Sequence, residues 1–218
     1  LAAKYGPVKW LVLSNRALFT YPVRPAPRER ISTLGFLSNL TYEKGTSLVI
    51  DLAREMKLHG MKDMRIIIAG PCHDLHLVEE LKRAQSEELI EWWGPVYGPD
   101  KERFWKETDV FLFPTRYPNE AEPLVVWESF AAACPVIAPN RGCISGQIRG
   151  AGLCVPPEED FGLATTRVLN QWRENPGDFT ELSSEALNRI EHSRIREEQH
   201  WHALVDALRG CNASNDQQ

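Results

Sequence analysis

The sequence lacks the cysteine spacing of a zinc-binding or disulfide-bonded protein. Its five cysteines are an odd number, and no two of them are spaced as Cys-x-x-Cys: Cys72, Cys134, Cys143, Cys154 and Cys211. A disulfide framework uses an even number of cysteines, and a structural zinc site uses closely spaced pairs. We therefore expect neither of them. Free thiols indicate a reducing compartment, which we predict to be the cytoplasm.

Three further absences narrow the possible functions. No apolar run approaches the ~20 residues that a membrane-spanning helix needs. The chain carries 25 Lys and Arg residues against 30 Asp and Glu residues, and the net charge of -5 argues against a nucleic acid as its partner. No Gly-x-Gly-x-x-Gly motif follows a predicted strand, which disfavours a redox enzyme that binds a dinucleotide.

The two ends of the chain are expected to lie outside the main domain. The first residue is Leu1 and no signal peptide follows, so we expect that an N-terminal part was removed or is not in this chain. Residues 1–30 are predicted to form an entry strand and a proline-rich linker, whose Arg24, Arg28 and Arg30 we interpret as solubilising side chains. Residues 209–218 are polar and are expected to form a disordered tail.

Between these ends, residues 31–208 are predicted to form one α/β domain. The composition, 43% hydrophobic and 25% charged, is that of an ordinary globular protein. Short apolar runs alternate with helical patterns, which predicts a single doubly wound parallel sheet of about six strands with helices on both faces. The expected strands are residues 31–37, 65–69, 90–93, 110–113, 135–139 and 152–155.

Two candidate ligand-binding residues follow the fourth expected strand. Glu120 lies in the polar loop that follows this strand, and Glu128 is the only charged residue of the apolar helix predicted after Pro123. A carboxylate on such a helix face needs hydrogen-bond donors, and a ribose diol offers two. In open α/β sheets, ligands bind at the carboxyl ends of the strands.

The two acids, separated by seven residues, resemble the Glu-x7-Glu signature of retaining glycosyltransferases of the GT-B fold. The run from Glu120 through the following apolar helix to the Pro-Val-Ile-Ala strand is similar to the donor-site segment of glycosyltransferase family 4. The resemblance implies the C-terminal, Rossmann-like half of a GT-B fold, which binds a nucleotide diphosphate sugar. Two unrelated surface glutamates are the plainer alternative.

A second segment carries the same resemblance. Lys44 and Gly45 precede a predicted helix that begins at Thr46, and a helix N-terminus with an adjacent lysine is suited to bind phosphate. The segment from Gly35 to Gly45 resembles the first phosphate-binding loop of family 4 enzymes. The family's arginine position in this loop is Asn39 here, which removes one charge-assisted contact.

The resemblance implies a role for each matched residue. Lys44 and Glu120 are the expected catalytic residues: Lys44 would bind the diphosphate, and Glu120 would orient the sugar. The expected donor-binding residues are Asn39, Lys44, Gly45, Val96, Glu120, Leu124, Val125 and Glu128. Val96 would offer its backbone to the base, and the amides of Leu124 and Val125 would meet a phosphate. No metal or other cofactor is expected, because Lys44 and helix N-termini would stabilise the leaving group.

The implied donor is a UDP- or GDP-linked sugar, and the implied partner is an N-terminal acceptor-binding half that this chain lacks. Any peripheral membrane association would come through that half, and the chain alone is expected to be inactive. Two positions depart from the family: Pro123 replaces a frequent glycine and has no N–H to donate, and Gly146 replaces a glutamate. The alternatives are a noncatalytic Rossmann-like interaction module and half of a sugar-nucleotide epimerase.

Overall fold

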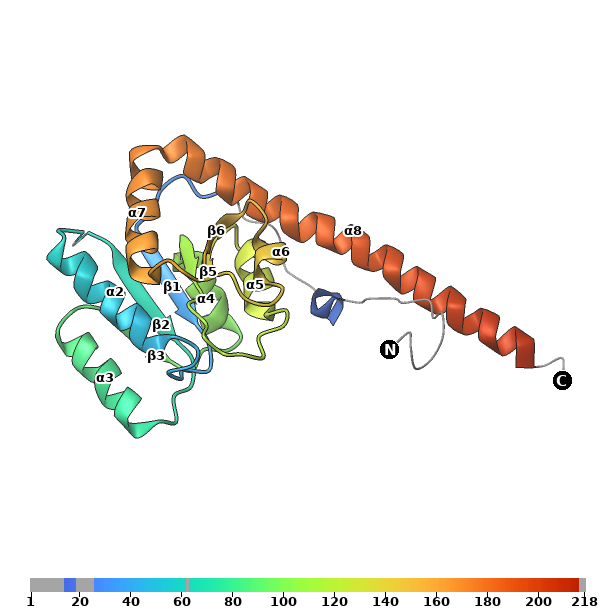
Figure 1. Cartoon of the computed structure of the whole chain (residues 1–218), viewed down its shortest axis with the longest axis horizontal. Helices are drawn as coiled ribbons and strands as arrows, with labels where there is room; N and C mark the ends of the chain where they lie inside the picture. Colours follow the sequence, from blue (N-terminus) through green and yellow to red (C-terminus); the bar gives the residue numbers. More distant parts are fainter. Residues whose placement is uncertain (1–13, 19–25, 62, 216–218) are drawn as a thin grey trace. The chain divides into compact units, whose positions relative to one another are not determined.

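A computed structural model of the chain describes residues 14–18, 26–61 and 63–215, with the backbone alone described from residue 210 onward (Figure 1). These residues fall into two compact units, Tyr21–Ile190 and a smaller one formed by Leu1–Thr20 and Glu191–Gln218. The entry strand expected within residues 1–30 lies outside the described residues. The sequence-based domain boundaries at residues 30 and 208 stay a prediction.

The larger unit contains one six-stranded parallel sheet with the order β3-β2-β1-β4-β5-β6. All six predicted strands are present, with bounds that shift by two residues at most: β1 (Thr33–Leu37), β2 (Arg65–Ala69), β3 (Glu91–Gly94), β4 (Val110–Leu112), β5 (Val136–Pro139) and β6 (Gly152–Val155). The strand order reverses between β1 and β4, as in a Rossmann fold. The predicted doubly wound α/β sheet is confirmed.

Helices cover both faces of this sheet (Figure 1). Successive strand residues point to opposite faces, so Ile66 and Ile68 of β2 pack with α2, α3 and α7, whereas Ile67 packs with α4, α5 and α6. The helices are α2 (Thr46–Leu58), α3 (Leu75–Ser86), α4 (Pro99–Glu107), α5 (Leu124–Ala131), α6 (Ile144–Ile148), α7 (Phe161–Glu174) and α8 (Pro176–Asn215). Within the residues described, no helix combines the length and the apolar character needed to cross a membrane.

The five-residue helix α6 lies between β5 and β6. The carboxyl-terminal end of the chain differs from the sequence-based expectation. Helix α8 extends to Asn215, so the backbone is helical through most of the segment expected to be a disordered tail. Residues 216–218 lie outside the described part.

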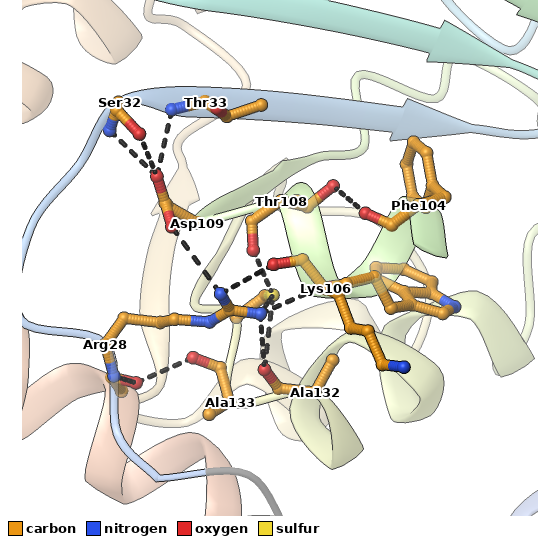
Figure 2. A network of polar contacts seen from close by, with 12 residues as sticks. Arg28, Ser32, Thr33, Phe104, Lys106, Thr108, Asp109, Ala132 and Ala133 are labelled. Carbon is orange, nitrogen blue, oxygen red and sulfur yellow. Dashed lines mark hydrogen bonds and ion pairs between the residues drawn. The ribbon is translucent and has the colours of Figure 1, made fainter. Parts of the chain in front are cut away.

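The interpretation of Arg28 as a solubilising side chain is wrong. Its guanidinium donates to the carbonyl oxygens of Trp105 at 2.7 Å and Lys106 at 2.9 Å, and more weakly to Ala132 at 3.3 Å (Figure 2). It also lies 3.7 Å from a carboxylate oxygen of Asp109. Arg28 therefore ties the segment before β1 to the carboxyl ends of α4 and α5, because these helix ends present unpaired carbonyl groups.

Asp109 extends this network to the start of β1. One of its carboxylate oxygens accepts hydrogen bonds from the backbone N–H groups of Ser32 and Thr33, at 2.8 and 3.0 Å (Figure 2). The backbone N–H of Arg28 donates to the hydroxyl of Ser183 in α8, which in turn donates to the carbonyl of Ala133. The network joins four elements at the amino-terminal edge of the sheet, opposite the edge where ligands bind.

The smaller unit includes the short 3₁₀ helix η1 (Asn15–Leu18) and the part of α8 from Glu191 onward. The backbone N–H of Ser14 donates to the carboxylate of Glu197 at 2.9 Å. Arg16, Ser193 and Glu197 are buried in this unit. Burial of such groups requires polar partners, which the Ser14–Glu197 contact provides in part.

Candidate functional site

A cavity of about 360 Å³ lies at the carboxyl ends of the central strands, where the strand order reverses between β1 and β4. Ser38 after β1, Gly70 after β2, Val96 after β3 and Phe113 after β4 all line it. Seven of the eight predicted donor-binding residues line this one cavity: Asn39, Lys44, Val96, Glu120, Leu124, Val125 and Glu128. Residues that are up to 89 positions apart are thus brought together at the edge expected to bind a ligand.

Gly45, the eighth predicted residue, is not among the cavity-lining residues, but it shapes the loop that carries Lys44. It caps α2 with a positive φ of 83°, and a Cβ atom at this position would lie 2.2 Å from the carbonyl oxygen of Pro114. Only glycine allows this approach of the loop before α2 to the end of β4. The N–H of Arg116 also donates to the carbonyl of Glu43 at 2.7 Å, so the two loops that carry Lys44 and Glu120 are joined.

Lys44 and Glu120 form an ion pair inside the cavity. The Lys44 Nζ donates to Glu120 Oε2 at 2.6 Å, and the two side chains are 23% and 10% exposed. The hydroxyl of Thr115 donates to the same oxygen at 2.9 Å, and the Lys44 ammonium lies 4.6 Å from the centre of the Tyr117 ring. An ammonium has three N–H donors, so Lys44 retains donors for a phosphate while it remains bound to Glu120.

The loop after β5 holds the Glu120 loop in place. The N–H of Cys143 donates to the carbonyl of Ala121 at 3.2 Å. A Cβ atom at Gly142, where φ is 54°, would lie 2.2 Å from the carbonyl oxygen of Glu120. Gly146, at the position where the family has a glutamate, is exposed in α6 and is not among the cavity-lining residues.

Glu128 has a partner that sequence reasoning missed. Its Oε1 accepts a hydrogen bond from Lys101 Nζ at 2.6 Å, and its side chain is 14% exposed. The other oxygen, Oε2, is buried without a hydrogen-bond partner among the described residues. Lys101 lies one turn before Phe104, the buried residue of α4, but the local sequence does not show that its partner is Glu128.

The first turn of α5 contributes backbone donors. Helix α5 begins at Leu124 after Pro123, and no side chain caps it. The first N–H groups of a helix have no partner within the helix and favour an anion. Because Leu124 and Val125 both line the cavity, this helix start faces the same space as Lys44 and Glu128.

The described polar side chains around the start of α3 do not form a metal site. Asp74 caps α3, and its carboxylate accepts from the N–H groups of His76 and Leu77 at 2.9 and 3.1 Å. In the part of the chain that the structure describes, no group of three His, Cys, Asp or Glu side chains could hold a metal ion.

Comparison with known proteins agrees with this geometry. The family model described as glycosyl transferases group 1 matches residues 31–171, well over half of the chain. No curated protein sequence matches this chain. The crystal structure of WaaG, a glycosyltransferase involved in lipopolysaccharide biosynthesis, is 12% identical with a TM-score of 0.61, and the match covers 75% of this chain and 44% of WaaG.

Two further solved structures show the same fold. Anabaena HepE in complex with UDP-glucose is 19% identical with a TM-score of 0.63, covering 81% of this chain and 49% of HepE. S. aureus TarM in complex with UDP and other ligands is 17% identical with a TM-score of 0.65, covering 85% of this chain and 39% of TarM. The chain thus spans less than half the length of these structures and corresponds to the Rossmann-like C-terminal half of the GT-B fold. It belongs to the glycosyl transferases group 1 family.

Proposed function

We propose that this chain is the donor-binding half of a retaining glycosyltransferase and binds a nucleotide diphosphate sugar. The observation that carries the proposal is the convergence of Lys44, Glu120 and Glu128 on one cavity at the reversal point of the sheet. Each group supplies what one part of such a donor requires: a cation for the diphosphate, and carboxylates for sugar and ribose hydroxyls.

The proposed donor lies across the cavity from β3 to α5. The backbone near Val96 meets the base, and the buried Oε2 of Glu128 accepts from a ribose hydroxyl. Lys44 and the N–H groups of Leu124 and Val125 bind the diphosphate and stabilise it as the leaving group. Glu120 binds the sugar ring. We propose that Lys44 and these oriented N–H groups stabilise the departing diphosphate without a metal ion.

The similar structures support the choice of donor. HepE is described in complex with UDP and glucose, and an O-GlcNAc transferase, GtfA, in complex with UDP and GlcNAc. We propose that transfer needs an N-terminal acceptor-binding half and that the 218-residue chain alone binds donor without transferring sugar. The cytoplasmic location stays a prediction that depends on the free thiols.

The test is a calorimetric titration of the full 218-residue chain with UDP, GDP and ADP. Glu128→Ala should weaken binding of the preferred nucleotide by about 1–3 kcal/mol, because a ribose hydroxyl loses its acceptor. Glu79→Ala, which removes an exposed glutamate of α3 outside the cavity, is the matched control and should leave the affinity unchanged. If none of the three nucleotides binds at millimolar concentration, the proposal is wrong and a noncatalytic interaction module becomes the better reading.

A further inference from the structure

Only one of the two carboxylate oxygens of Glu128 has a hydrogen-bond partner among the described residues. Lys101 binds Oε1 at 2.6 Å, while Oε2 is buried and has no hydrogen-bond partner among the described residues. Both side chains line the cavity. Nearly all buried polar atoms in proteins have a partner, so an unpartnered carboxylate oxygen beside a cavity indicates a donor group on a ligand.

Lys101 stands at a position that local helix energetics disfavour. It is in the first turn of α4, where the helix dipole favours acids, and its neighbours Asp100 and Glu102 follow that preference. Its ammonium is directed instead to α5, 27 residues further along the chain. The described contact that offsets this unfavourable position is the ion pair with Glu128, which also lines the cavity.

We propose that Lys101 is a positioning residue that makes the cavity selective for a ribose with free hydroxyls. The inference rests on the proposed function and extends it to a residue outside the Glu-x7-Glu motif. By binding Oε1, Lys101 holds the Glu128 side chain in one orientation. Oε2 is then presented to the cavity as a fixed acceptor. A ribose hydroxyl can donate to it, whereas a deoxyribose carbon cannot.

Lysine suits this task because only one of the two oxygens needs to be held. A single ammonium at 2.6 Å satisfies Oε1 and leaves Oε2 available, whereas a bidentate arginine could bind both oxygens. The side chain of Lys101 is 36% exposed and that of Glu128 is 14% exposed, so Glu128 is the more buried partner of the pair.

The test compares UDP with 2′,3′-dideoxy-UDP, or GDP with its dideoxy form if GDP binds better, by calorimetric titration of the full chain. The wild-type protein should prefer the ribonucleotide by about tenfold, the usual effect of removing one partner of a buried hydrogen bond. Lys101→Met should reduce this preference to less than about threefold, with little change in affinity for the dideoxy form. A general loss of structure would weaken both ligands equally.

Two further variants complete the design. Lys106→Met removes the same charge from an exposed position of α4 and should leave the preference at its wild-type value. Lys101→Arg keeps the charge but can bind both carboxylate oxygens, so it should also lower the preference; a full wild-type preference in this variant would contradict the requirement for a free Oε2. The wild-type ratio is measured without any variant, so a Lys101→Met protein that fails to fold leaves the inference open to refutation.

The outcomes separate this inference from the proposed function. If UDP, GDP and ADP all fail to bind, the proposed function is wrong, and the role of Lys101 falls with it. If a nucleotide binds but the wild-type protein does not distinguish ribose from dideoxyribose, or Lys101→Met keeps the full preference, donor binding stands and the positioning role is refuted.

Discussion

Replacing Arg28 by methionine tests whether the segment before β1 is held by the guanidinium network in Figure 2. Methionine keeps much of the apolar stem and removes the charge and its donors. The carbonyl oxygens of Trp105, Lys106 and Ala132 lose a charged donor, and Asp109 loses its cationic neighbour. The last step of the network, from the N–H of Arg28 to Ser183, is made by the backbone and remains.

The expected loss in the free energy of unfolding follows from these contacts. A hydrogen bond from a charged group contributes about 1.5–3 kcal/mol, and breaking a buried ion pair costs about 3–5 kcal/mol. Two features reduce the sum: the Arg28 side chain is 19% exposed, so water reaches part of the gap, and Asp109 keeps its bonds from Ser32 and Thr33. We therefore expect the free energy of unfolding to fall by about 3 kcal/mol.

Urea denaturation measures this loss. With a slope of about 2 kcal/mol per molar urea, the midpoint of Arg28→Met should fall by about 1.5 M. The control is Arg30→Met, which removes the same group from an exposed position two residues further on and should cost less than about 0.5 kcal/mol. Equal midpoints for the two variants would refute the anchoring role and restore the solubilising one.

Three further outcomes are expected. Gly142→Ala, where a Cβ would lie 2.2 Å from a carbonyl oxygen of the site loop, should weaken nucleotide binding several-fold by titration, while Gly146→Ala, with no atom within 4 Å of its Cβ, should not. Burial raises the pKa of Cys134 to about 12, so mass-spectrometric mapping after alkylation at pH 8 should find this thiol unmodified until urea is added. The hydrogen bonds from Arg65 lower the pKa of Glu91 below its ordinary 4.5. This interaction therefore stabilises the fold above pH 4.5, and the stabilisation is lost as the pH falls. In acid unfolding curves, the free energy of unfolding of Arg65→Met should decrease less steeply with falling pH than that of the wild-type protein.

The sequence predicted the parts of the site that follow from local pattern. Lys44 and Glu120 come shortly after apolar runs that end at a loop, and Glu128 is in the helix that follows. In a parallel sheet, all strands end at the same edge, so a correct list of strands already places these residues near one another. The short apolar runs and the turn residues that end them were sufficient for that list, and the six strands are confirmed.

The contacts missed from the sequence depend on how helices pack over the sheet. Lys101 and Glu128 are 27 residues apart, and Arg28 reaches carbonyl groups 77 to 104 residues away. Nothing in the local pattern around a lysine in a helix, or an arginine in a proline-rich linker, distinguishes a paired side chain from an exposed one. Only the crossing of α4 and α5 over the sheet decides which partner each cation meets.

The pairing of both acids gives the site a particular electrostatic character. The charged residues lining the cavity are Lys44, Lys101, Glu120 and Glu128, so their charges cancel. With Asn39 in place of an arginine, a diphosphate finds no surplus cation. Its attraction must therefore come from sharing Lys44 with Glu120 and from oriented N–H groups at the start of α5. Such dipoles attract an anion only at short range and in one geometry. For the proposed donor, we therefore expect recognition of the diphosphate to depend on fit within the site more than on long-range attraction.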